Sequence, residues 1–421
     1  MKKWLLTAAM AAGLLATPAL AETKLQLVEV ITSPERTEVL KTMVAAFETA
    51  NPGTTVEIVS LPWGQAFEKL LTMVQGGQKP DVVEMPERWL SLYANRGELE
   101  SLEPYLAKWP ETSQLADRVL EYGRAAKKTA YEIPYGFYIR AMFYNKKLFA
   151  QAGIDHPPAT LEEFTADAAK ISAIPGKYGF CLRGSKGGFT GWQYFMLTQM
   201  GRRDWFEADG SSTFNSPEAV KGMQQLIDVY QKGYAPKDSV NWGFNEIVAG
   251  FYSGTCAMLD QDPDALIAVA ERMDKNDFAV APMPKGPSGK SFPSIGYAGW
   301  AMFHDSKDKD ASWKLIAHLS NAENNMTWAK FVGVIPTHKG ADHDPAFSGE
   351  NYAGWFQELS DPAYDMVAVP VHLEKLGYFF DVMSVPSSQE MLLGKKTAQQ
   401  VADQWAKYLG DAQKEYLAKN K

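Results

Sequence analysis

The feature that most constrains the fold of this chain is a regular alternation of strand and helix signals along residues 25–85. A β-rich run at 25–31 is followed by Ser-Pro-Glu at 33–35, which is typical of the N-cap, first position and acidic first turn of a helix. Apolar residues then recur at helical period over 39–47, and Asn-Pro-Gly at 51–53 is expected to end that helix.

The same alternation continues with a predicted strand at 55–61, a helix at 65–75 and a buried strand at 81–85. A β-α-β-α-β order predicts a mostly parallel sheet with helices on both faces, and ligands bind such sheets at the carboxyl ends of their strands. The ends of these three strands lie at 32–36, 62–65 and 84–89. We expect a ligand site there.

A second alternating unit begins near Pro134, with one strand expected at 138–144, another at 178–182 and a long helix at 216–232. The Pro-rich segment 281–293 is typical of a connector, after which strand character returns at 295–303. A mature chain of about 400 residues exceeds what one hydrophobic core usually serves, so the prediction is an α/β protein of two domains.

The amino terminus has the form of a secretory signal peptide. Lys2 and Lys3 precede an apolar run at 4–15, and Ala19-Leu20-Ala21 matches a signal-peptidase site. We expect cleavage after Ala21 and a periplasmic mature protein. A retained membrane anchor is the alternative, but the run is shorter than the roughly 20 apolar residues of a spanning helix. No cysteine stands at the cut to carry a lipid.

The net charge limits the classes of partner that the mature chain could bind, and the two cysteines raise the question of a disulfide. Loss of Lys2 and Lys3 leaves 40 basic against 50 acidic side chains, a formal charge of −10. This balance disfavours nucleic acid and anionic membrane surfaces as partners. The two cysteines, Cys181 and Cys256, would lie in an oxidising compartment, where a disulfide is permitted. Two buried thiols are the equal alternative at this stage.

Four short motifs, in this order and spacing, carry a resemblance to a known family: K-P-D-V-V at 79–83, A-Y-E-I-P-Y at 130–135, F-Y-N-K-K-L-F at 143–149 and F-Y-S-G-T-C-A-M at 251–258. Together with the signal peptide and the opening strand-helix pattern, they resemble the extracellular solute-binding proteins of ABC importers, the group that includes maltose-binding-like sugar receptors. The similarity runs from about Lys24 to the C-terminus.

The resemblance implies a type II periplasmic binding protein: two doubly wound lobes, each discontinuous in sequence, joined by a hinge. The N-terminal lobe would comprise 22–133 and 294–338, and the C-terminal lobe 134–293 and 339–421, with crossovers near 132–134, 291–295 and 337–341. It also implies a monomer without cofactor that closes on a small-molecule sugar and delivers it to the transmembrane permease subunits of an importer.

A sugar ring offers an apolar C–H face and a rim of hydroxyls, so its receptor needs flat aromatic surfaces and planar polar side chains. The chain has twelve tryptophans, and several of them lie beside turn signals. Three of these are candidates for the aromatic surfaces: Trp63, Trp242 and Trp300. Core filling is the competing interpretation for each of them, as for Trp89.

The polar candidates follow predicted strand ends. In the first lobe these are Glu35, Arg36, Gln65, Glu84, Glu87 and Arg88, which could form charge-assisted hydrogen bonds; surface ion pairs are the alternative. In the second lobe they are Arg183, beside glycines at 184 and 187–188, and the group Asn241, Asn245, Asp260 and Gln261 around Trp242. Near the expected hinge lie Tyr135, Tyr138, Arg140 and Tyr297, and hinge packing is the alternative for Tyr135 and Tyr297.

Other functions are less well supported by the sequence. A periplasmic glycosidase would need two carboxylates such as Glu84 and Asp260 around the scissile bond, but no recognisable catalytic motif surrounds them. The six histidines are scattered without the paired spacing of a metal site. We therefore expect no catalytic or metal-binding residue. A phosphorylated or sulfonated polyol remains an alternative ligand, with Arg36, Arg88 and Arg183 neutralising the anion.

Overall fold

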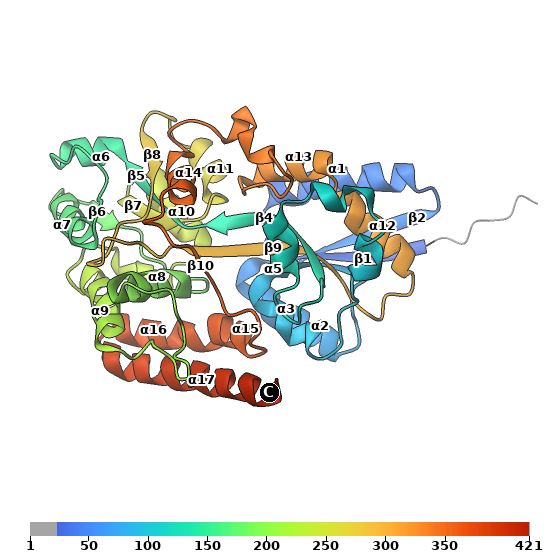
Figure 1. The fold of residues 1–421 in the computed structure, drawn as a ribbon. Helices are drawn as coiled ribbons and strands as arrows, with labels where there is room; N and C mark the ends of the chain where they lie inside the picture. The colour runs from blue at the N-terminus through green and yellow to red at the C-terminus, as the bar shows by residue number, and fades with distance from the viewer. Residues whose placement is uncertain (1–22, 421) are drawn as a thin grey trace, which may run out of the picture.

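Two β-sheets organise the molecule, one in each half of the computed structural model, which describes residues 23–420 (Figure 1). The first sheet has the order β10-β9-β3-β1-β2, with β4 also paired to β9. Its strands are β1 (Thr23–Glu29), β2 (Thr54–Ser60), β3 (Val82–Pro86), β4 (Glu132–Ile139), β9 (Ser294–Met302) and β10 (Val367–Ala368). The second, ordered β6-β7-β5-β8, contains β5 (Ala141–Asn145), β6 (Tyr178–Phe180), β7 (Cys256–Gln261) and β8 (Phe278–Ala281).

The opening β-α-β-α-β pattern is present as predicted, and β1 pairs in parallel with both β2 and β3. The expectation of a mostly parallel sheet holds for these three strands and for the short pair of β9 with β10, but β9 runs antiparallel to both β3 and β4. In the second sheet only β6 and β7 are parallel. The returning β9 therefore adds an antiparallel member that local periodicity could not show.

Local sequence explains the first helix, α1 (Pro34–Ala50). The side chain of Ser33 accepts a hydrogen bond from the Arg36 N–H at 3.2 Å, and Pro34 takes the first helical position, where no amide donor is needed. The apolar stripe that ends with Phe47 is buried against the sheet. Because α1 begins at the carboxyl end of β1, its first turn places Arg36 at that strand end.

Helices cover both faces of the first sheet: α1 and α13 lie above it in Figure 1, and α2 and α3 lie below. The helices of this half are α2 (Trp63–Gln75), α3 (Glu87–Ala94), α4 (Glu103–Leu106), α5 (Asp117–Gly123), α12 (Lys309–Ser320) and α13 (Ala322–Val332). Those of the other half are α6 (Lys146–Gln151), α7 (Leu161–Ser172), α8 (Phe189–Met200), α9 (Pro217–Gln231), α10 (Phe244–Tyr252), α11 (Ala265–Ala270) and α14 (Ala353–Ser360).

The single strand expected at 138–144 is two strands that belong to different sheets. β4 stays paired with β9 as far as Ile139, and β5 pairs with β7 and β8 from Ala141 onward. The chain thus passes between the sheets at Arg140, whose N–H donates to the carbonyl of Ser294 at 3.1 Å. The first crossover lies several residues beyond the 132–134 expected from the sequence, because β4 as a whole pairs with the first sheet.

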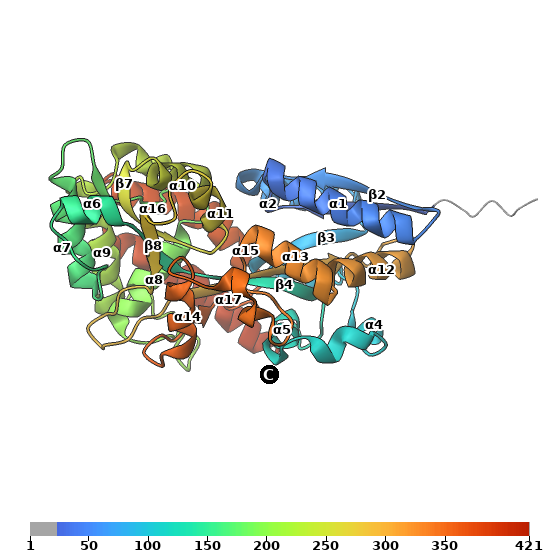
Figure 2. The ribbon, with the colours of Figure 1, turned by 90° about the horizontal axis from the view of Figure 1, so that it is seen from above.

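The C-terminal part of the chain reaches both halves. It forms α15 (Leu376–Tyr378), a π-helical turn at Phe379–Met383, α16 (Ser384–Leu392) and α17 (Ala398–Lys419). α15 packs on α3 of the first half, whereas α16 and α17 pack on α9 of the second. Seen from above, the two halves lie side by side, and this segment underlies them (Figure 2).

This architecture is an α/β fold of two lobes. The expected signal peptide and its cleavage after Ala21 fall outside the described residues. Within residues 23–420, none of the helices combines the length and apolar character that a membrane crossing requires.

Candidate functional site

Glu84 lies at the carboxyl end of β3, and its carboxylate is engaged by its own lobe. One oxygen accepts from the backbone N–H groups of Val30 and Ile31, at 2.8 and 2.9 Å. The other accepts from Arg36 at 2.8 Å and from the Tyr135 hydroxyl at 2.6 Å. Its side chain is 1% exposed. Glu84 therefore fixes the end of β1 and orients Arg36, and contact of its carboxylate with ligand hydroxyls stays a prediction.

Arg36 keeps unused hydrogen-bond donors despite this ion pair. Its guanidinium lies 4.7 Å from the ring centre of Trp328, and its Nε and Nη1 atoms are buried without a hydrogen-bond partner in the protein. The hydroxyls of Tyr135 and Tyr138 are 2.8 Å apart beside it. Unpaired buried donors are costly, so these atoms are available to donate to a bound group that accepts hydrogen bonds.

A second group of first-lobe residues stands at the ends of β2 and β3. The indole of Trp63 stacks on Trp89, with ring centres 5.6 Å apart, and the Arg88 guanidinium lies 4.5 Å from the Trp63 ring centre. Arg88 also lies 3.4 Å from the Asp381 carboxylate, and its Nη2 atom has no partner. Trp89 is fully buried, and its indole N–H donates to the Asp381 carboxylate at 2.7 Å. Trp89 therefore fills the core, as in the competing interpretation of the tryptophans.

Glu87 begins α3 and is 7% exposed. Burial raises its pKa to about 7, an effect that the neighbouring Arg88 opposes. The carboxylate of Asp262, from the other lobe, also raises it.

The second lobe contributes a compact ionic group at the end of β7. Arg140 lies 3.4 Å from the Asp260 carboxylate and 3.6 Å from that of Asp262, and it donates to the Gln261 side chain at 3.1 Å. Burial raises the pKa of Asp260 to about 6, against the attraction of Arg140. Burial and the neighbouring Asp262 raise the pKa of Asp264 to about 7.

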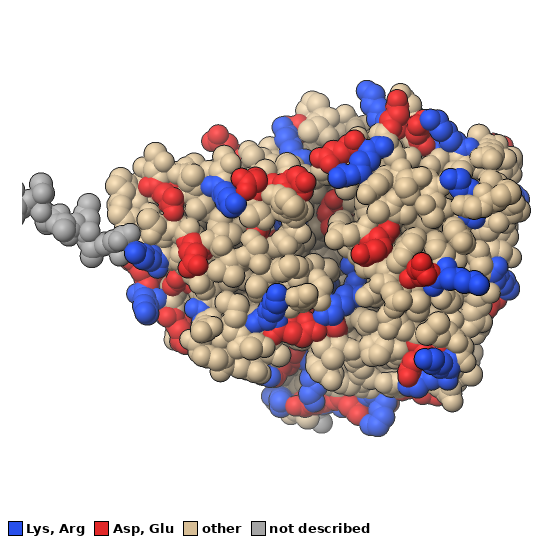
Figure 3. All heavy atoms as spheres, turned by 180° about the vertical axis from the view of Figure 1, so that it is seen from behind, with Lys and Arg blue, Asp and Glu red and all other residues tan. Residues whose placement is uncertain are grey.

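Arg183 follows β6 and lies at the start of the glycine-containing loop, as predicted. Its Nε donates to the Lys186 carbonyl at 2.7 Å, and its guanidinium lies 5.9 Å from the Phe244 ring centre. Burial lowers its pKa to about 10, with further lowering by Arg140 and by Arg88 of the opposite lobe. Lys186 joins the lobes through an ion pair with Glu68 of α2, at 2.7 and 2.9 Å. Figure 3 shows a hollow between the lobes, rimmed by side chains of both charges.

Trp242 is half-buried, and the remaining candidates divide between solvent and core. Four of them are exposed: Glu35, Gln65, Asn241 and Asn245. Tyr297 and Trp300 are each only 1% exposed. Tyr297 donates to the Tyr122 carbonyl at 2.9 Å, and Trp300 packs against Tyr135 and Trp328. Both rings therefore pack within the first lobe, and contact of Tyr297 and Trp300 with a ligand stays a prediction.

Several residues of the site were missed by the sequence interpretation. Asp262 and Asp264 lie two and four residues after Asp260. The run Asp-Gln-Asp-Pro-Asp at a strand end could have indicated both as site residues. Phe380 and Asp381 had none, since they reach Arg88 and Trp89 only by the long-range folding of the C-terminal segment onto α3.

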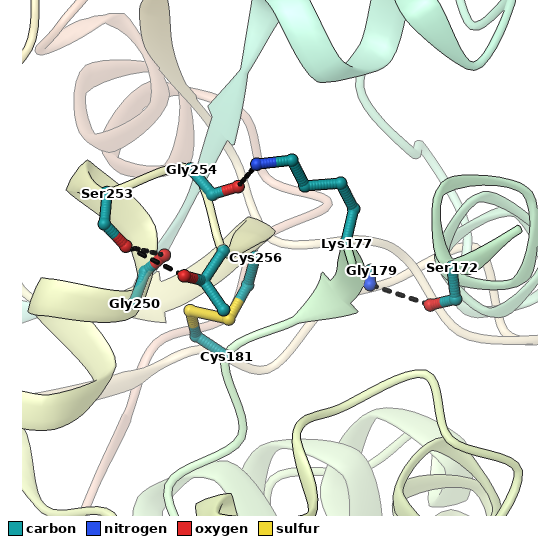
Figure 4. Close-up of a disulfide and its surroundings, with 9 residues drawn as sticks. Ser172, Lys177, Gly179, Cys181, Gly250, Ser253, Gly254 and Cys256 are labelled. Carbon is teal, nitrogen blue, oxygen red and sulfur yellow. Dashed lines mark hydrogen bonds between the residues drawn. A yellow bond between two sulfur atoms is a disulfide. The ribbon is translucent and has the colours of Figure 1, made fainter. Parts of the chain in front are cut away.

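Cys181 and Cys256 form a disulfide, which settles the alternative that the sequence left open (Figure 4). Cys181 directly follows β6 and Cys256 begins β7, and these neighbouring strands are parallel. The bridge lies two residues before Arg183.

Comparison with known proteins identifies the family. The sequence model of the family described as bacterial extracellular solute-binding protein matches residues 33–326 of this chain. The chain belongs to this family of extracellular solute-binding proteins, as the sequence motifs predicted.

Two relatives illustrate the range of the family. A protein of Brucella abortus (strain 2308), named only as a binding protein, is 29% identical over 300 residues, which span 70% of this chain and 71% of the relative. The sn-glycerol-3-phosphate-binding periplasmic protein UgpB of Yersinia pestis is 30% identical over 225 residues, 48% of each chain.

Solved structures confirm the two-lobed type II fold. An ABC substrate-binding protein from Listeria monocytogenes in complex with cycloalternan has a TM-score of 0.81 at 22% identity, over 93% of this chain and 98% of that one. The maltose-bound MalE3 of T. maritima has a TM-score of 0.80 at 23% identity, over 92% and 99%. A solute-binding protein from Agrobacterium radiobacter K84 in complex with ribitol has 0.79 at 20% identity, over 93% and 99%.

Proposed function

We propose that this chain is a non-catalytic binding protein of the periplasm that captures a sugar or polyol between its lobes and delivers it to the permease of an ABC importer. One observation carries the proposal: Arg36 and Arg88, at strand ends of the first lobe, keep buried donors without a protein partner, and Lys186 of the second lobe pairs with Glu68 of the first at 2.7 Å. The neighbours named for maltose, cycloalternan and ribitol support a polyhydroxylated ligand.

The mechanism rests on contacts that exist only when the lobes are together. A ligand that accepts from Arg36 and Arg88 on one side and contacts the Arg140–Asp260 group on the other binds the closed form better than the open form. It therefore shifts the equilibrium toward closure by its differential affinity. The lobes of the proposal are the two sheets with their helices, and they differ from the sequence-based division at β4 and β10, which both pair with β9 of the first sheet.

A thermal-shift screen of mono- and oligosaccharides and polyols tests this function, because a ligand that binds only the native state raises the unfolding midpoint. We expect at least one neutral or charged member to bind one to one, with a change in tryptophan emission from Trp63 or Trp242. A panel in which every member leaves the midpoint unchanged would refute capture of this ligand class. The binding member should be recovered intact after long incubation, since Glu84 has both carboxylate oxygens engaged.

A second candidate ligand is a polyol that carries an anionic group. Among residues 23–420, Arg36, Arg88 and Arg140 each form an ion pair within 4.0 Å, with Glu84, Asp381 and Asp260, whereas Arg183 forms none. The half-length similarity to the sn-glycerol-3-phosphate-binding protein points in the same direction. Calorimetry with glycerol and sn-glycerol 3-phosphate separates the two, and Arg183→Gln should abolish any preference for the phosphate.

A further inference from the structure

The disulfide, Trp242 and the Arg183 loop form one packed unit in the second lobe. A Cβ atom placed on Gly250 of α10 would lie 2.9 Å from Cζ3 of Trp242, 3.0 Å from the sulfur of Cys181 and 3.3 Å from that of Cys256. The indole and both sulfurs therefore converge on a helix position where there is no space for a methyl group. Figure 4 shows Gly250 beside the bridge.

Backbone hydrogen bonds connect this unit to the loop that carries Arg183. The N–H of Ser185 donates to the Trp242 carbonyl at 3.0 Å, and that of Gly184 donates to the Ser239 carbonyl at 3.0 Å. The approach is close, because a Cβ on Gly184 would lie 2.3 Å from the Val240 carbonyl oxygen. A shift of either segment would therefore move the other.

The bridge itself is placed to hold both segments. Cys181 N–H already donates to the Met258 carbonyl at 2.9 Å, so β6 and β7 are paired without the disulfide. What the disulfide adds is a covalent link between Cys181, two residues before Arg183, and Cys256, and both sulfurs border the same Gly250 position that the Trp242 indole approaches. Asp260 and Gln261 are at the other end of the same β7 strand.

We infer that the Cys181–Cys256 disulfide, with Gly250, is a positioning element of the ligand site, so that the reduced protein stays folded but binds ligand more weakly. The inference rests on the proposed function for its ligand. Reduction by a dithiol breaks the S–S bond and leaves two thiols, while the dithiol becomes a cyclic disulfide. The two cysteines are then no longer linked beside Gly250, so Trp242 and the Arg183 loop can shift, and affinity falls because the site must be ordered on binding.

The experiment has a ligand arm and a ligand-free arm. In the ligand arm, maltose, ribitol and sn-glycerol 3-phosphate are titrated by calorimetry into the oxidised protein, the dithiothreitol-reduced protein and the double variant Cys181→Ala/Cys256→Ala. For each probe that binds the oxidised form, we expect affinity to fall by about tenfold or more in both other forms. Gly250→Ala keeps the bridge but displaces the indole, and it should lower affinity likewise.

In the ligand-free arm, the emission of Trp242 is obtained by subtracting the fluorescence of Trp242→Phe from that of the wild type. The subtraction is made before and after reduction, and far-UV circular dichroism checks that each form is folded. We expect this difference to change on reduction while the circular dichroism stays native. Dithiothreitol should have no effect on the double variant.

The two arms separate the two claims. If no probe binds any form, the proposed function fails for these ligands, and the emission of Trp242 still decides whether the bridge determines its surroundings. Unchanged affinity in the reduced and double-variant proteins, or unchanged Trp242 emission, would overturn the positioning role. Loss of the native circular dichroism on reduction would also overturn it, since the bridge would then be needed for folding.

Discussion

Trp242 is the aromatic side chain whose role is most sharply testable, because it is half-buried and touches the disulfide unit. Replacement by Ala should weaken ligand binding by about 2 kcal/mol or more, as for an anchor at a binding hot spot. The ligand-free unfolding free energy should fall by less than the roughly 3–5 kcal/mol of a fully buried Trp. Calorimetry and denaturant titration measure the two effects.

A matched control for this variant is Trp313→Ala on α12. Trp313 is also partly buried, but it stacks on Tyr105 at 5.1 Å, away from the cleft. It should lose stability with unchanged affinity. If Trp242→Ala behaves in the same way, Trp242 does not belong to the ligand site.

Glu87 should make stability depend on pH. Burial raises its folded pKa from the ordinary 4.5 to about 7, so between these values the folded state holds a proton that the unfolded chain has released. This contribution is fully present below about pH 4.5 and is lost as the pH rises to about 7. Glu87→Gln should therefore raise the unfolding free energy at pH 8 by about 1–3 kcal/mol and change it little at pH 4.5.

Urea titrations of the wild type and Glu87→Gln at both pH values measure this difference. Glu57→Gln on β2 is the control, since its exposed side chain meets the Gln26 amide at 3.4 Å. An equal effect of Glu87→Gln at the two pH values would show that the Glu87 carboxyl does not titrate with a raised pKa.

At the scale of elements, the π-helical turn at Phe379–Met383 connects the C-terminal segment to the first lobe. Asp381 accepts from the Trp89 indole at 2.7 Å and lies 3.4 Å from Arg88, and all three residues are buried. A π-helical turn is rare and often accompanies a functional site. Here it brings the Asp381 carboxylate to the buried Arg88 guanidinium. Among the described residues, the other carboxylate within ion-pair distance of Arg88 is that of Glu87, at 4.0 Å.

Asp381→Ala should therefore lower the unfolding free energy by about 3 kcal/mol, because it removes one partner of a buried pair. Asp365→Ala is the matched control: its ion pair with Arg203 is largely exposed and is expected to contribute less than about 1 kcal/mol. Denaturant titration of both variants makes the comparison. Equal losses would mean that the C-terminal segment does not depend on this contact.

At the scale of the whole molecule, closure is the event that the site requires. Contacts between strand ends of separate sheets exist only with the lobes together, so a binding ligand should lower the radius of gyration measured by small-angle scattering. The ion pair of Glu68 with Lys186 also joins the lobes, but it is partly exposed. Glu68→Gln should therefore weaken affinity by no more than about fivefold, less so at high salt. A radius unchanged by a saturating ligand would remove the closure mechanism.

The sequence by itself determined the elements and the strand ends. Helical period, the Ser33 cap and the buried strand at 81–85 act over a few residues, so α1, α2 and β3 and the positions of Arg36, Glu87 and Arg88 could be predicted. The family followed from short motifs at fixed spacing. The candidate set remains to be tested with ligand.

Tertiary structure decided the contacts between distant segments. Only folding showed that Trp300 fills the first lobe, that the chain crosses between sheets at Arg140, that Asp381 reaches Arg88 across 293 residues and that the cysteines are bonded. The physical reason is that burial and pairing depend on which faces of the folded chain meet. A local pattern gives the face of each element but not its partner.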